Sequence, residues 1–208
     1  MKTTWIFDLD NTIHDTSKAI FPIINRKMNA YIQNLLSINE QKANVIRLQY
    51  WLQYGSTLKG LMKNYKVNPN DFLEQTHNIK SYAGLVYPAE NLTKTLASLP
   101  GKKILFTNAP KNYALEVIKQ CDIEKYFSNL HFIECSRFNG KPSEESMKIF
   151  LAKYKVKKAH FIDDEKQNLK TAKKYGVKTI WINKGQKKPQ YIDKKITHLR
   201  EVLRLPIF

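Results

Sequence analysis

Cysteine is scarce in this chain of 208 residues, which carries only Cys121 and Cys135. The two do not form a CxxC pair, so the sequence offers neither a disulfide framework nor a thiolate metal site, and it favours a reducing compartment. No apolar run approaches the ~20 residues that a membrane-spanning helix needs. The first apolar segment begins almost at Met1, which leaves no room for a signal peptide. Together these absences predict a cytoplasmic protein without a membrane partner.

Acidic residues are also few, since the chain has 18 Asp and Glu against 35 Lys and Arg and a formal net charge of +17. A positive field of this kind attracts phosphorylated small molecules or nucleic acid. The lysines are spread over many segments, however, and the sequence has no ribonucleoprotein box, zinc-ligand pattern or basic leucine zipper. A solvated, lysine-rich surface is therefore the simpler interpretation, and we do not expect a nucleic-acid partner.

Five short apolar segments predict buried strands, because continuous apolarity without alternation is typical of strands covered on both faces. They are residues 3–9, 102–108, 130–135, 159–164 and 177–183. Helical patterns lie between the later strands, at residues 110–121, 143–155 and 165–176. Strands and helices in alternation indicate a parallel sheet with right-handed crossovers, so we expect an α/β fold with a doubly wound parallel sheet. Residues 184–208 predict a surface loop followed by a short helix.

A long helical stretch separates the first two predicted strands. The separation is about ninety residues, far more than a crossover loop needs. Helical periodicity runs through it, interrupted at Gly55 and at Asn68-Pro69. We therefore predict a helical cap domain at residues 18–81, inserted into an α/β core domain made of residues 1–17 and 82–208.

Residues suited to catalysis stand at or just after the ends of several predicted strands. They are Asp8, Asp10 and Thr12 for the first strand, Thr107 and Asn108 for the second, Lys141 for the third, and Asp163 and Asp164 for the fourth. Ligands of open α/β sheets bind at the carboxyl ends of the strands, so we expect these side chains to converge on one crevice. Clustered carboxylates need a cation to stay ionised together, and oxygen ligands favour Mg²⁺. Lysine, threonine and asparagine suit phosphoryl oxygens, so a metal and a phosphate are predicted together.

Asp8 and Asp10 are the candidate pair for covalent catalysis. A carboxylate at a strand end can attack phosphorus in line and form an aspartyl phosphate, which divides hydrolysis into two easier steps, and we assign this role to Asp8. Asp10 would protonate the leaving oxygen as general acid and then deprotonate the attacking water. Taken one at a time, all these features also fit turns, a solvated lysine and helix N-caps. Their occurrence in this order, each near a strand end, favours the catalytic interpretation.

Four segments, FDLDNT, LFTNA, GKP and FIDDEKQN, resemble the motifs of the haloacid dehalogenase-like hydrolase superfamily. The resemblance covers the predicted core and implies a Rossmann-like fold with Mg²⁺-dependent phosphohydrolase activity. It implies that Asp8 is the nucleophile and a metal ligand, and that Asp10 is the acid/base and binds the metal through its carbonyl. It also implies that Thr107 and Lys141 contact the phosphoryl group.

The same resemblance assigns roles to the remaining acidic residues. By analogy with related members that carry Glu-Asp or Gly-Asp at this place, it makes Asp164 the direct metal ligand. Asp163 then acts on Lys141 or reaches the metal through water. Asn168 matches the position that holds a metal-bound water, and the implied cofactor is Mg²⁺.

The predicted cap resembles one branch of the superfamily. The segment YWLQYGSTLKGLMKNYKVNP is similar to the helical cap of pyrimidine 5'-nucleotidases, through Tyr54-Gly55 and Lys59-Gly60-Leu61. This resemblance implies a nucleoside 5'-monophosphate as substrate. A cap that closes over the crevice excludes water and contacts the substrate, so specificity is expected to reside there.

The candidate substrate-binding residues are Thr12, His14, Tyr50, Tyr54 and Lys59. The two tyrosines, with Trp51 and Leu58, also have the helical spacing of a bundle core. The nucleotidase branch usually has Leu-Tyr-Pro where this chain has Ile13-His14-Asp15. Of these, His14 and Asp15 lie at the hinge of the cap and either change substrate choice or belong to the start of the first helix of the insertion, with Asp15, Thr16 or Ser17 as its N-cap.

Other functions are open at this point. A phosphatase for another small metabolite, such as a sugar phosphate or phosphoglycolate, and a phosphomutase share the same motifs. A dehalogenase is disfavoured, because carbon–halogen chemistry needs no leaving-group acid and that branch lacks the second Asp, here Asp10. Outside enzymes, the fold could serve as a basic module that binds nucleic acid or protein, but the intact carboxylate set argues against this.

Overall fold

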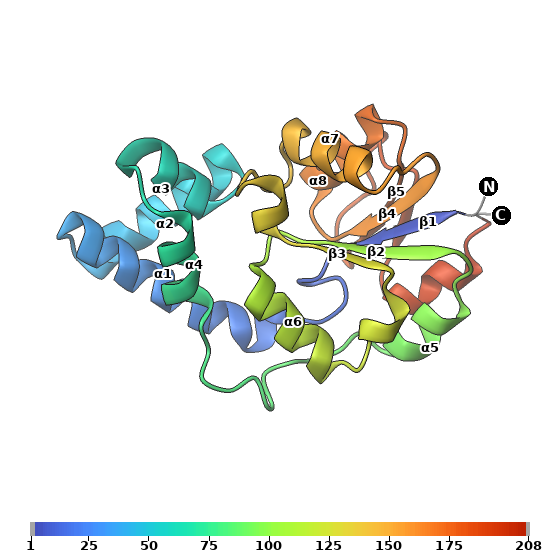
Figure 1. Ribbon diagram of the computed structural model, residues 1–208, viewed down its shortest axis with the longest axis horizontal. Coiled ribbons are helices and arrows are strands. Elements are labelled where there is room, and N and C mark those ends of the chain that lie inside the picture. The colour runs from blue at the N-terminus through green and yellow to red at the C-terminus, as the bar shows by residue number, and fades with distance from the viewer. Residues whose placement is uncertain (1–2, 207–208) are drawn as a thin grey trace.

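The computed structural model describes residues 3–206 of the chain. Residues 1–2 and 207–208, the ends of the predicted core domain, lie outside the described residues. The strands are β1 Thr4–Phe7, β2 Lys102–Phe106, β3 Asn129–His131, β4 Ala159–Asp163, β5 Lys178–Ile182 and β6 Lys194–Ile196. They form one sheet in the order β3-β2-β1-β4-β5-β6, and every neighbouring pair is parallel. The predicted doubly wound α/β fold is therefore confirmed (Figure 1).

Helices cover the sheet on both faces, which explains why its central strands are apolar without alternation. These helices are α5 Leu92–Ser98, α6 Lys111–Gln120, α7 Glu144–Lys153 and α8 Lys166–Lys174. In β1, Trp5 and Phe7 lie in one buried apolar cluster with α5 and α6, whereas Ile6 lies in another with α7 and α8. Figure 1 shows α7 and α8 above the sheet and α5 and α6 below it.

Three elements differ from the sequence prediction. The predicted surface loop after residue 183 contains strand β6, a three-residue Lys-Lys-Ile segment that is too short and too charged to show a strand pattern. The strand predicted at 130–135 ends at His131, and Ile133–Ser136 forms the 3₁₀-helix η3, because Ile133 packs into the helical insertion instead of the sheet. Helix α5 was not predicted. The short C-terminal helix is the 3₁₀-helix η4, Leu199–Arg204.

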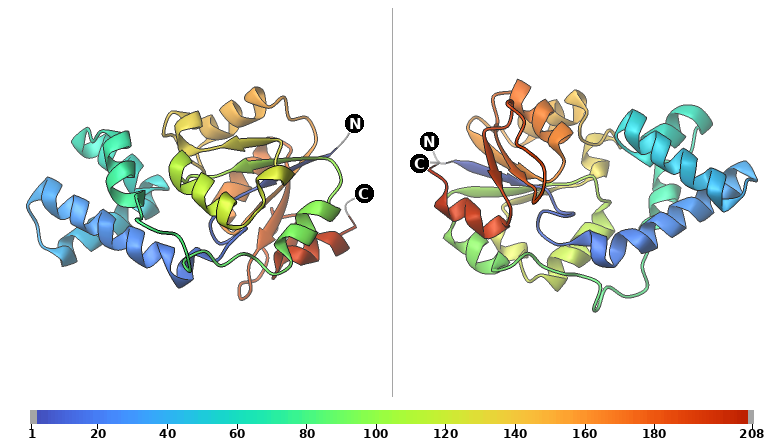
Figure 2. Two further views of the ribbon diagram at one scale, coloured as in Figure 1. Left: turned by 60° about the horizontal axis from the view of Figure 1, so that its bottom comes forward. Right: turned by 180° about the vertical axis from the view of Figure 1, so that it is seen from behind.

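Four helices occupy the predicted insertion and lie to one side of the sheet (Figure 2). They are α1 Ile20–Leu36, α2 Glu40–Tyr54, α3 Thr57–Tyr65 and α4 Pro69–His77. The side chains of Asn39, Ser56 and Asn68 cap the amino ends of α2, α3 and α4. Helix α2 ends at Gly55, whose φ of 83° is in the left-handed region that favours glycine. The helical insertion is present, and its bounds as a separate domain stay a prediction.

The helical insertion has an apolar core of its own. Ile32, Leu61 and Phe72 are fully buried in it, and Ile133 joins this cluster from the loop after β3. At Gly60, an added Cβ would lie 2.5 Å from Cβ of Tyr50, so α2 and α3 approach closely at this pair. The insertion is therefore packed both internally and against the sheet-bearing part of the chain.

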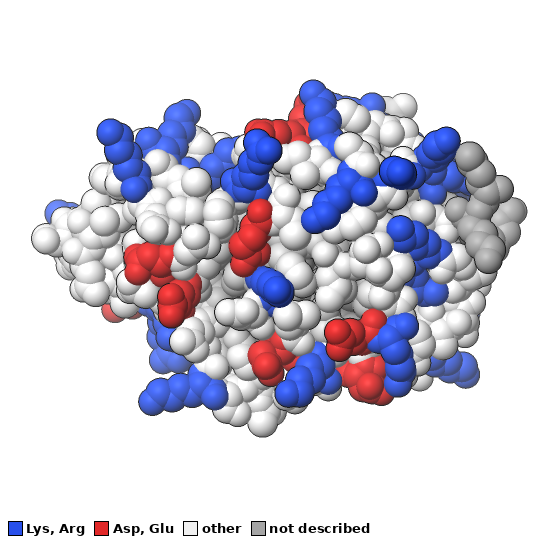
Figure 3. Space-filling model, viewed as in Figure 1, with Lys and Arg blue, Asp and Glu red and all other residues white. Residues whose placement is uncertain are grey.

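Charged side chains are spread over the surface. Figure 3 shows lysine and arginine side chains over the whole visible face, with acidic side chains between them. This distribution supports the interpretation of a solvated basic surface. Within residues 3–206, no helix combines the length and the apolarity needed to cross a membrane.

Candidate active site

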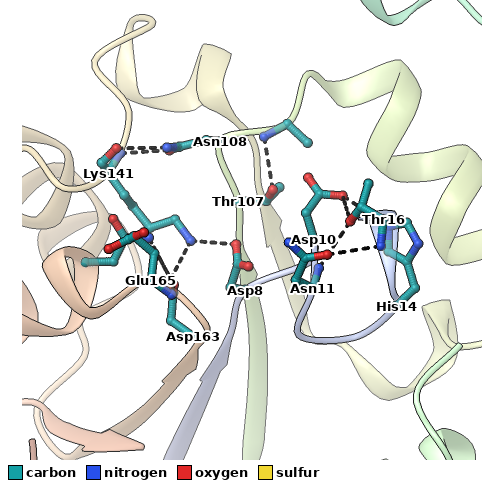
Figure 4. Close-up of polar contacts among 12 residues, drawn as sticks. Asp8, Asp10, Asn11, His14, Thr16, Thr107, Asn108, Lys141, Asp163 and Glu165 are labelled. Atoms are coloured by element: carbon teal, nitrogen blue, oxygen red, sulfur yellow. Dashed lines mark hydrogen bonds and ion pairs between the residues drawn. The ribbon is translucent and has the colours of Figure 1, made fainter. Parts of the chain in front are cut away.

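The candidate residues meet at the carboxyl ends of three adjacent strands. Strand β1 lies between β2 and β4 in the sheet, so Asp8 after β1, Thr107 after β2 and Asp163 at the end of β4 are neighbours. Lys141 reaches them from the loop between η3 and α7, although it is 133 residues from Asp8 in sequence. Figure 4 shows these side chains turned toward one another.

Lys141 is a buried cation held between two carboxylates. Its Nζ donates to Oδ1 of Asp8 at 2.6 Å and to Oδ2 of Asp163 at 2.8 Å. It also lies 5.3 Å from the ring centroid of Phe106 and 5.2 Å from that of Phe161. Burial alone would lower the pKa of Lys141, but the two carboxylates outweigh it and raise this pKa above its ordinary value. The alternative of a solvated turn lysine is wrong, since Lys141 is only 3% exposed.

Asn108 fixes the loop that carries Lys141. Its Nδ2 donates to the carbonyl oxygen of Lys141 at 2.8 Å, and its Oδ1 accepts from the backbone N–H of Lys141 at 2.7 Å. An added Cβ at Gly140 would lie 2.7 Å from this Oδ1, so the glycine allows the close approach. Both ends of the Asn108 amide are thus engaged by the protein. Thr107 accepts from the N–H of Ala109 at 3.0 Å, which leaves its hydroxyl proton for another acceptor.

Asp163 is fully buried and surrounded by donors. Besides Lys141, the N–H of Glu165 donates to its Oδ1 at 2.8 Å, and Nδ2 of Asn168 lies 3.0 Å from each of its oxygens. Asn168 therefore directs its amide nitrogen at Asp163. With four such contacts, Asp163 is suited to holding Lys141 in place.

Three carboxylates are close enough to share a cation. One oxygen from each of Asp8, Asp163 and Asp164 lies within 4.8 Å of the other two. Burial, together with Asp163, raises the pKa of Asp164 to about 7, although Lys141 and a hydrogen bond from Asn11 act in the other direction. Burial likewise raises the pKa of Asp8 well above its ordinary value, against the opposing effect of Lys141. Oxygen donors that are crowded and costly to ionise fit a hard divalent cation such as Mg²⁺.

Asp10 lies apart from these carboxylates in a separate hydrogen-bond network. Its Oδ1 is 2.6 Å from the hydroxyl of Tyr113, 3.1 Å from Nε2 of His14 and 3.3 Å from Oγ1 of Thr16. Burial alone would raise the pKa of Asp10, but the hydrogen bonds from His14 and Tyr113 outweigh it and lower this pKa. Tyr113 is not among the site residues predicted from the sequence. Its one signal is its place in the first turn of the helix that follows Thr107.

The predicted substrate-binding residues near the first strand are buried. His14 is 1% exposed and lies against Asp10 and Tyr113, so its ring faces the acid/base candidate. Thr12 is 2% exposed, and its Oγ1 has no hydrogen-bond partner among residues 3–206. The carboxylate of Asp15 accepts from the N–H of Ser17 and caps the 3₁₀-helix η1, Thr16–Lys18. The first long helix of the insertion, α1, has Ala19 at its N-cap and no side-chain cap, so the capping alternative is wrong for that helix.

The candidates in the insertion lie in different settings. Tyr50 is buried in the bundle core, in the cluster that also contains Leu58, so the core alternative describes it better than substrate binding. Tyr54 is half-buried, with Nζ of Lys63 5.2 Å from its ring centroid. Lys59 is half-buried on α3.

The turn at Gly55 brings the insertion against the catalytic loop. An added Cβ at Gly55 would lie 2.7 Å from Cδ of Pro142 and 3.7 Å from the carbonyl oxygen of Lys141. The structure therefore places the Tyr54-Gly55 turn beside the loop that carries Lys141.

The fold is a Rossmann-like α/β fold with a helical insertion. A sequence profile of the family described as "Haloacid dehalogenase-like hydrolase" matches residues 5–182. The chain belongs to this family, which confirms the predicted superfamily and the prediction of a hydrolytic enzyme. The predicted nucleotidase branch is a finer assignment that this match does not address.

Curated relatives and solved structures agree with this family. "Phosphate metabolism protein 8" of Saccharomyces cerevisiae is 25% identical in an alignment 195 residues long that covers 85% of this chain and 60% of the yeast protein. "Phosphorylated carbohydrates phosphatase" of Thermotoga maritima is 24% identical in an alignment 191 residues long that covers 85% of this chain and 82% of the relative. The crystal structure of a HAD phosphatase from Thermococcus onnurineus superposes with a TM-score of 0.69 at 21% identity, covering 98% of this chain and 97% of the other. The chain thus spans less than two thirds of its yeast relative, and the structural likeness shows the fold.

Proposed function

We propose that the protein is a Mg²⁺-dependent phosphatase that hydrolyses a small phosphomonoester through a phosphorylated Asp8. Family membership supports a hydrolase, and two relatives carry the word phosphatase in their names. The observation that carries the proposal is the contact of the Lys141 ammonium with Asp8, beside Asp163 and Asp164. A nucleophile, a cation for phosphoryl oxygens and a set of metal ligands then lie at one place.

The donor set indicates which residues would hold Mg²⁺. Asp163 already accepts from Lys141, Glu165 and Asn168, so we assign direct ligation to Asp8 and Asp164, with the carbonyl of Asp10. Asp163 then influences the metal site indirectly, by holding Lys141. Asn168 would contribute by orienting the Asp163 carboxylate, in addition to any contact with a metal-bound water. When bound, Mg²⁺ would neutralise the crowded carboxylates and polarise the phosphoryl group.

The protein's own groups account for both halves of hydrolysis. A carboxylate oxygen of Asp8 attacks phosphorus, and the bond from phosphorus to the leaving oxygen breaks as that oxygen receives a proton from Asp10, which Asp10 takes up when the negatively charged phosphate binds beside it. Asp10, now a carboxylate, takes a proton from a water that attacks the phosphorus of the aspartyl phosphate. This second displacement releases inorganic phosphate and restores the Asp8 carboxylate. Lys141 and the Thr107 hydroxyl bind the phosphoryl oxygens on which charge gathers.

The substrate class has two candidates. The resemblance of the cap to pyrimidine 5'-nucleotidases, with the Tyr54-Gly55 turn beside Pro142, favours a nucleoside 5'-monophosphate. The Thermotoga maritima relative is named for phosphorylated carbohydrates, which favours a sugar phosphate. Thr12, Tyr54 and Lys59 stay in the proposal as candidate substrate contacts. A cytoplasmic location also belongs to it, on the scarcity of cysteine.

Phosphate release from a panel of phosphomonoesters tests this proposal. The purified protein is assayed with nucleoside 5'-monophosphates, sugar phosphates and phosphoglycolate, in Mg²⁺ and in EDTA. The proposal expects Mg²⁺-dependent release of inorganic phosphate from at least one class, and isomerisation of a sugar phosphate without release would instead indicate a phosphomutase. Salt-sensitive RNA binding without any phosphate release would favour a binding module.

A further inference from the structure

The acid/base candidate is held by one of its two oxygens. Three groups converge on Oδ1 of Asp10, namely the hydroxyl of Tyr113 at 2.6 Å, Nε2 of His14 at 3.1 Å and Oγ1 of Thr16 at 3.3 Å. Across residues 3–206, Oδ2 of Asp10 has no hydrogen-bond partner, and the side chain is 21% exposed. Figure 4 shows His14 and Thr16 on the side of Asp10 that faces away from Lys141.

Tyr113 gives the shortest of these contacts and has little freedom to move. It lies on α6, is 1% exposed, and its ring packs among those of His14, His77 and Tyr82 at centroid distances of 6.5, 5.8 and 5.9 Å. Helix α6 begins directly after the Thr107 segment, so the hydroxyl of Tyr113 is fixed relative to the phosphoryl-binding residues as well. Two segments 103 residues apart in sequence thus meet at one carboxylate oxygen.

We propose that Tyr113 is a positioning residue for proton transfer: with His14, it holds Oδ1 of Asp10 so that Oδ2 is presented to the leaving oxygen of the substrate. This inference rests on the proposed function. The carboxylate would otherwise rotate about its Cβ–Cγ bond, and proton transfer requires a heavy-atom distance of roughly 2.6–3.2 Å. If the Tyr113 hydroxyl acts only by orienting Asp10, its removal should slow the reaction most for substrates whose leaving group needs a proton.

Two substrates separate this role from a structural one. Ribose 5-phosphate has a primary alkoxide leaving group that needs a proton. Its phosphate ester on a sugar is common to nucleoside 5'-monophosphates and sugar phosphates, the two proposed substrate classes. The leaving group of p-nitrophenyl phosphate is a stabilised phenolate, which departs with little help from an acid. The ratio kcat/KM includes the steps up to departure of the leaving group, so it excludes the later hydrolysis of the aspartyl phosphate.

The test compares Tyr113→Phe with the matched control Tyr82→Phe. Tyr82 belongs to the same aromatic cluster, but its hydroxyl donates to the carbonyl oxygen of His77 at 2.8 Å and does not contact Asp10. We expect Tyr113→Phe to lower kcat/KM at least ~10-fold for ribose 5-phosphate and less than ~2-fold for p-nitrophenyl phosphate. Tyr82→Phe should leave both values within ~2-fold of those of the unmodified protein.

A second variant keeps the test independent of one substitution. His14→Phe keeps a ring at this site but removes Nε2, and it should lower kcat/KM for the two substrates with the same selectivity. Equal losses for both substrates, or no loss, in Tyr113→Phe and His14→Phe would overturn the inference while the proposed function stands. Absence of Mg²⁺-dependent hydrolysis in the unmodified protein would refute the proposed function itself, and the inference with it.

Discussion

Replacement of Lys141 by methionine should impair both stability and activity. The side chain keeps its length but loses the ammonium that lies 2.6 Å from Asp8 and 2.8 Å from Asp163. All three groups are at least nine-tenths buried, with exposed fractions of 3%, 7% and 0%. The pKa of Lys141 in the folded protein lies above its ordinary value of 10.5. The stability that the charged Lys141 contributes is therefore fully present at neutral pH, and it is lost only as the pH rises through that higher pKa.

The loss of stability should be large in the absence of metal. Removal of one partner from a buried ion pair destabilises a protein by ~3–5 kcal/mol, because the other charge stays buried without compensation. We expect Lys141→Met to lower the free energy of unfolding by about this amount in urea at pH 7.5 with EDTA. Mg²⁺ should restore part of it, since a cation between Asp8 and Asp164 also neutralises the cluster.

The effect on catalysis should be separable from that on stability. Removal of one group that stabilises transition-state charge lowers kcat by roughly 10²–10³, so kcat of folded Lys141→Met should fall by about this factor. Lys103→Met is the matched control: Lys103 is 8% exposed, but its Nζ donates to the carbonyl oxygen of Leu99 at 2.6 Å and is remote from the carboxylate cluster. The control should lose ~1 kcal/mol of stability and no activity. Retention of normal kcat by folded Lys141→Met would refute the reasoning.

Three further substitutions test other parts of the site. Asp8→Asn should abolish phosphate release without lowering the urea midpoint, because it removes the nucleophile and one of three crowded carboxylates; steady-state turnover by this variant would exclude Asp8 as nucleophile. The pKa of Asp164 is raised from 3.8 to about 7, so its contribution to stability is fully present below 3.8 and is lost as the pH rises through 7. In EDTA, the free energy of unfolding of the unmodified protein should therefore fall more between pH 4 and pH 8 than that of Asp164→Asn, and equal decreases would contradict a raised pKa for Asp164. Gly55→Ala should destabilise the protein by ~1–3 kcal/mol and lower kcat/KM, because its Cβ would lie 2.7 Å from Cδ of Pro142. Gly176→Ala has a similarly positive φ of 75° but open space around its Cβ, so it isolates conformational strain; equal effects of the two would argue against a contact between insertion and loop.

Much of the fold follows from local sequence patterns. The apolar runs at β1, β2, β4 and β5 are covered on both faces, so their burial is visible in the sequence as continuous apolarity. Strand β6 could not be predicted in this way, because it is an edge strand of three residues, two of which are lysines. It forms by pairing with β5, so it depends on the rest of the sheet. Helix α5 is only seven residues long and carries too few turns for a clear period.

The candidate site shows the same division between local and tertiary information. The strand-end positions of Asp8 and Asp163 follow from the rule that ligands bind at the carboxyl ends of parallel strands. The contact between Tyr113 and Asp10 does not, because it depends on how α6 packs on the segment after β1. For Tyr50, helical spacing fits both a bundle core and a substrate contact, and its burial in the apolar core of the insertion depends on how α2 and α3 pack at Gly60.

Chemical trapping during turnover tests the central claim, a covalent phosphoryl intermediate on Asp8. Borohydride reduces an acyl phosphate to the alcohol and leaves free carboxylates intact, so it would convert phosphorylated aspartate to homoserine. Peptide 3–18, which follows from cleavage after Lys2 and Lys18, contains Asp8, Asp10 and Asp15 and can be sequenced by tandem mass spectrometry. We predict homoserine at residue 8 alone, and only when substrate and Mg²⁺ are both present. Homoserine at residue 10, or unmodified aspartate at all three positions during active turnover, would contradict the account.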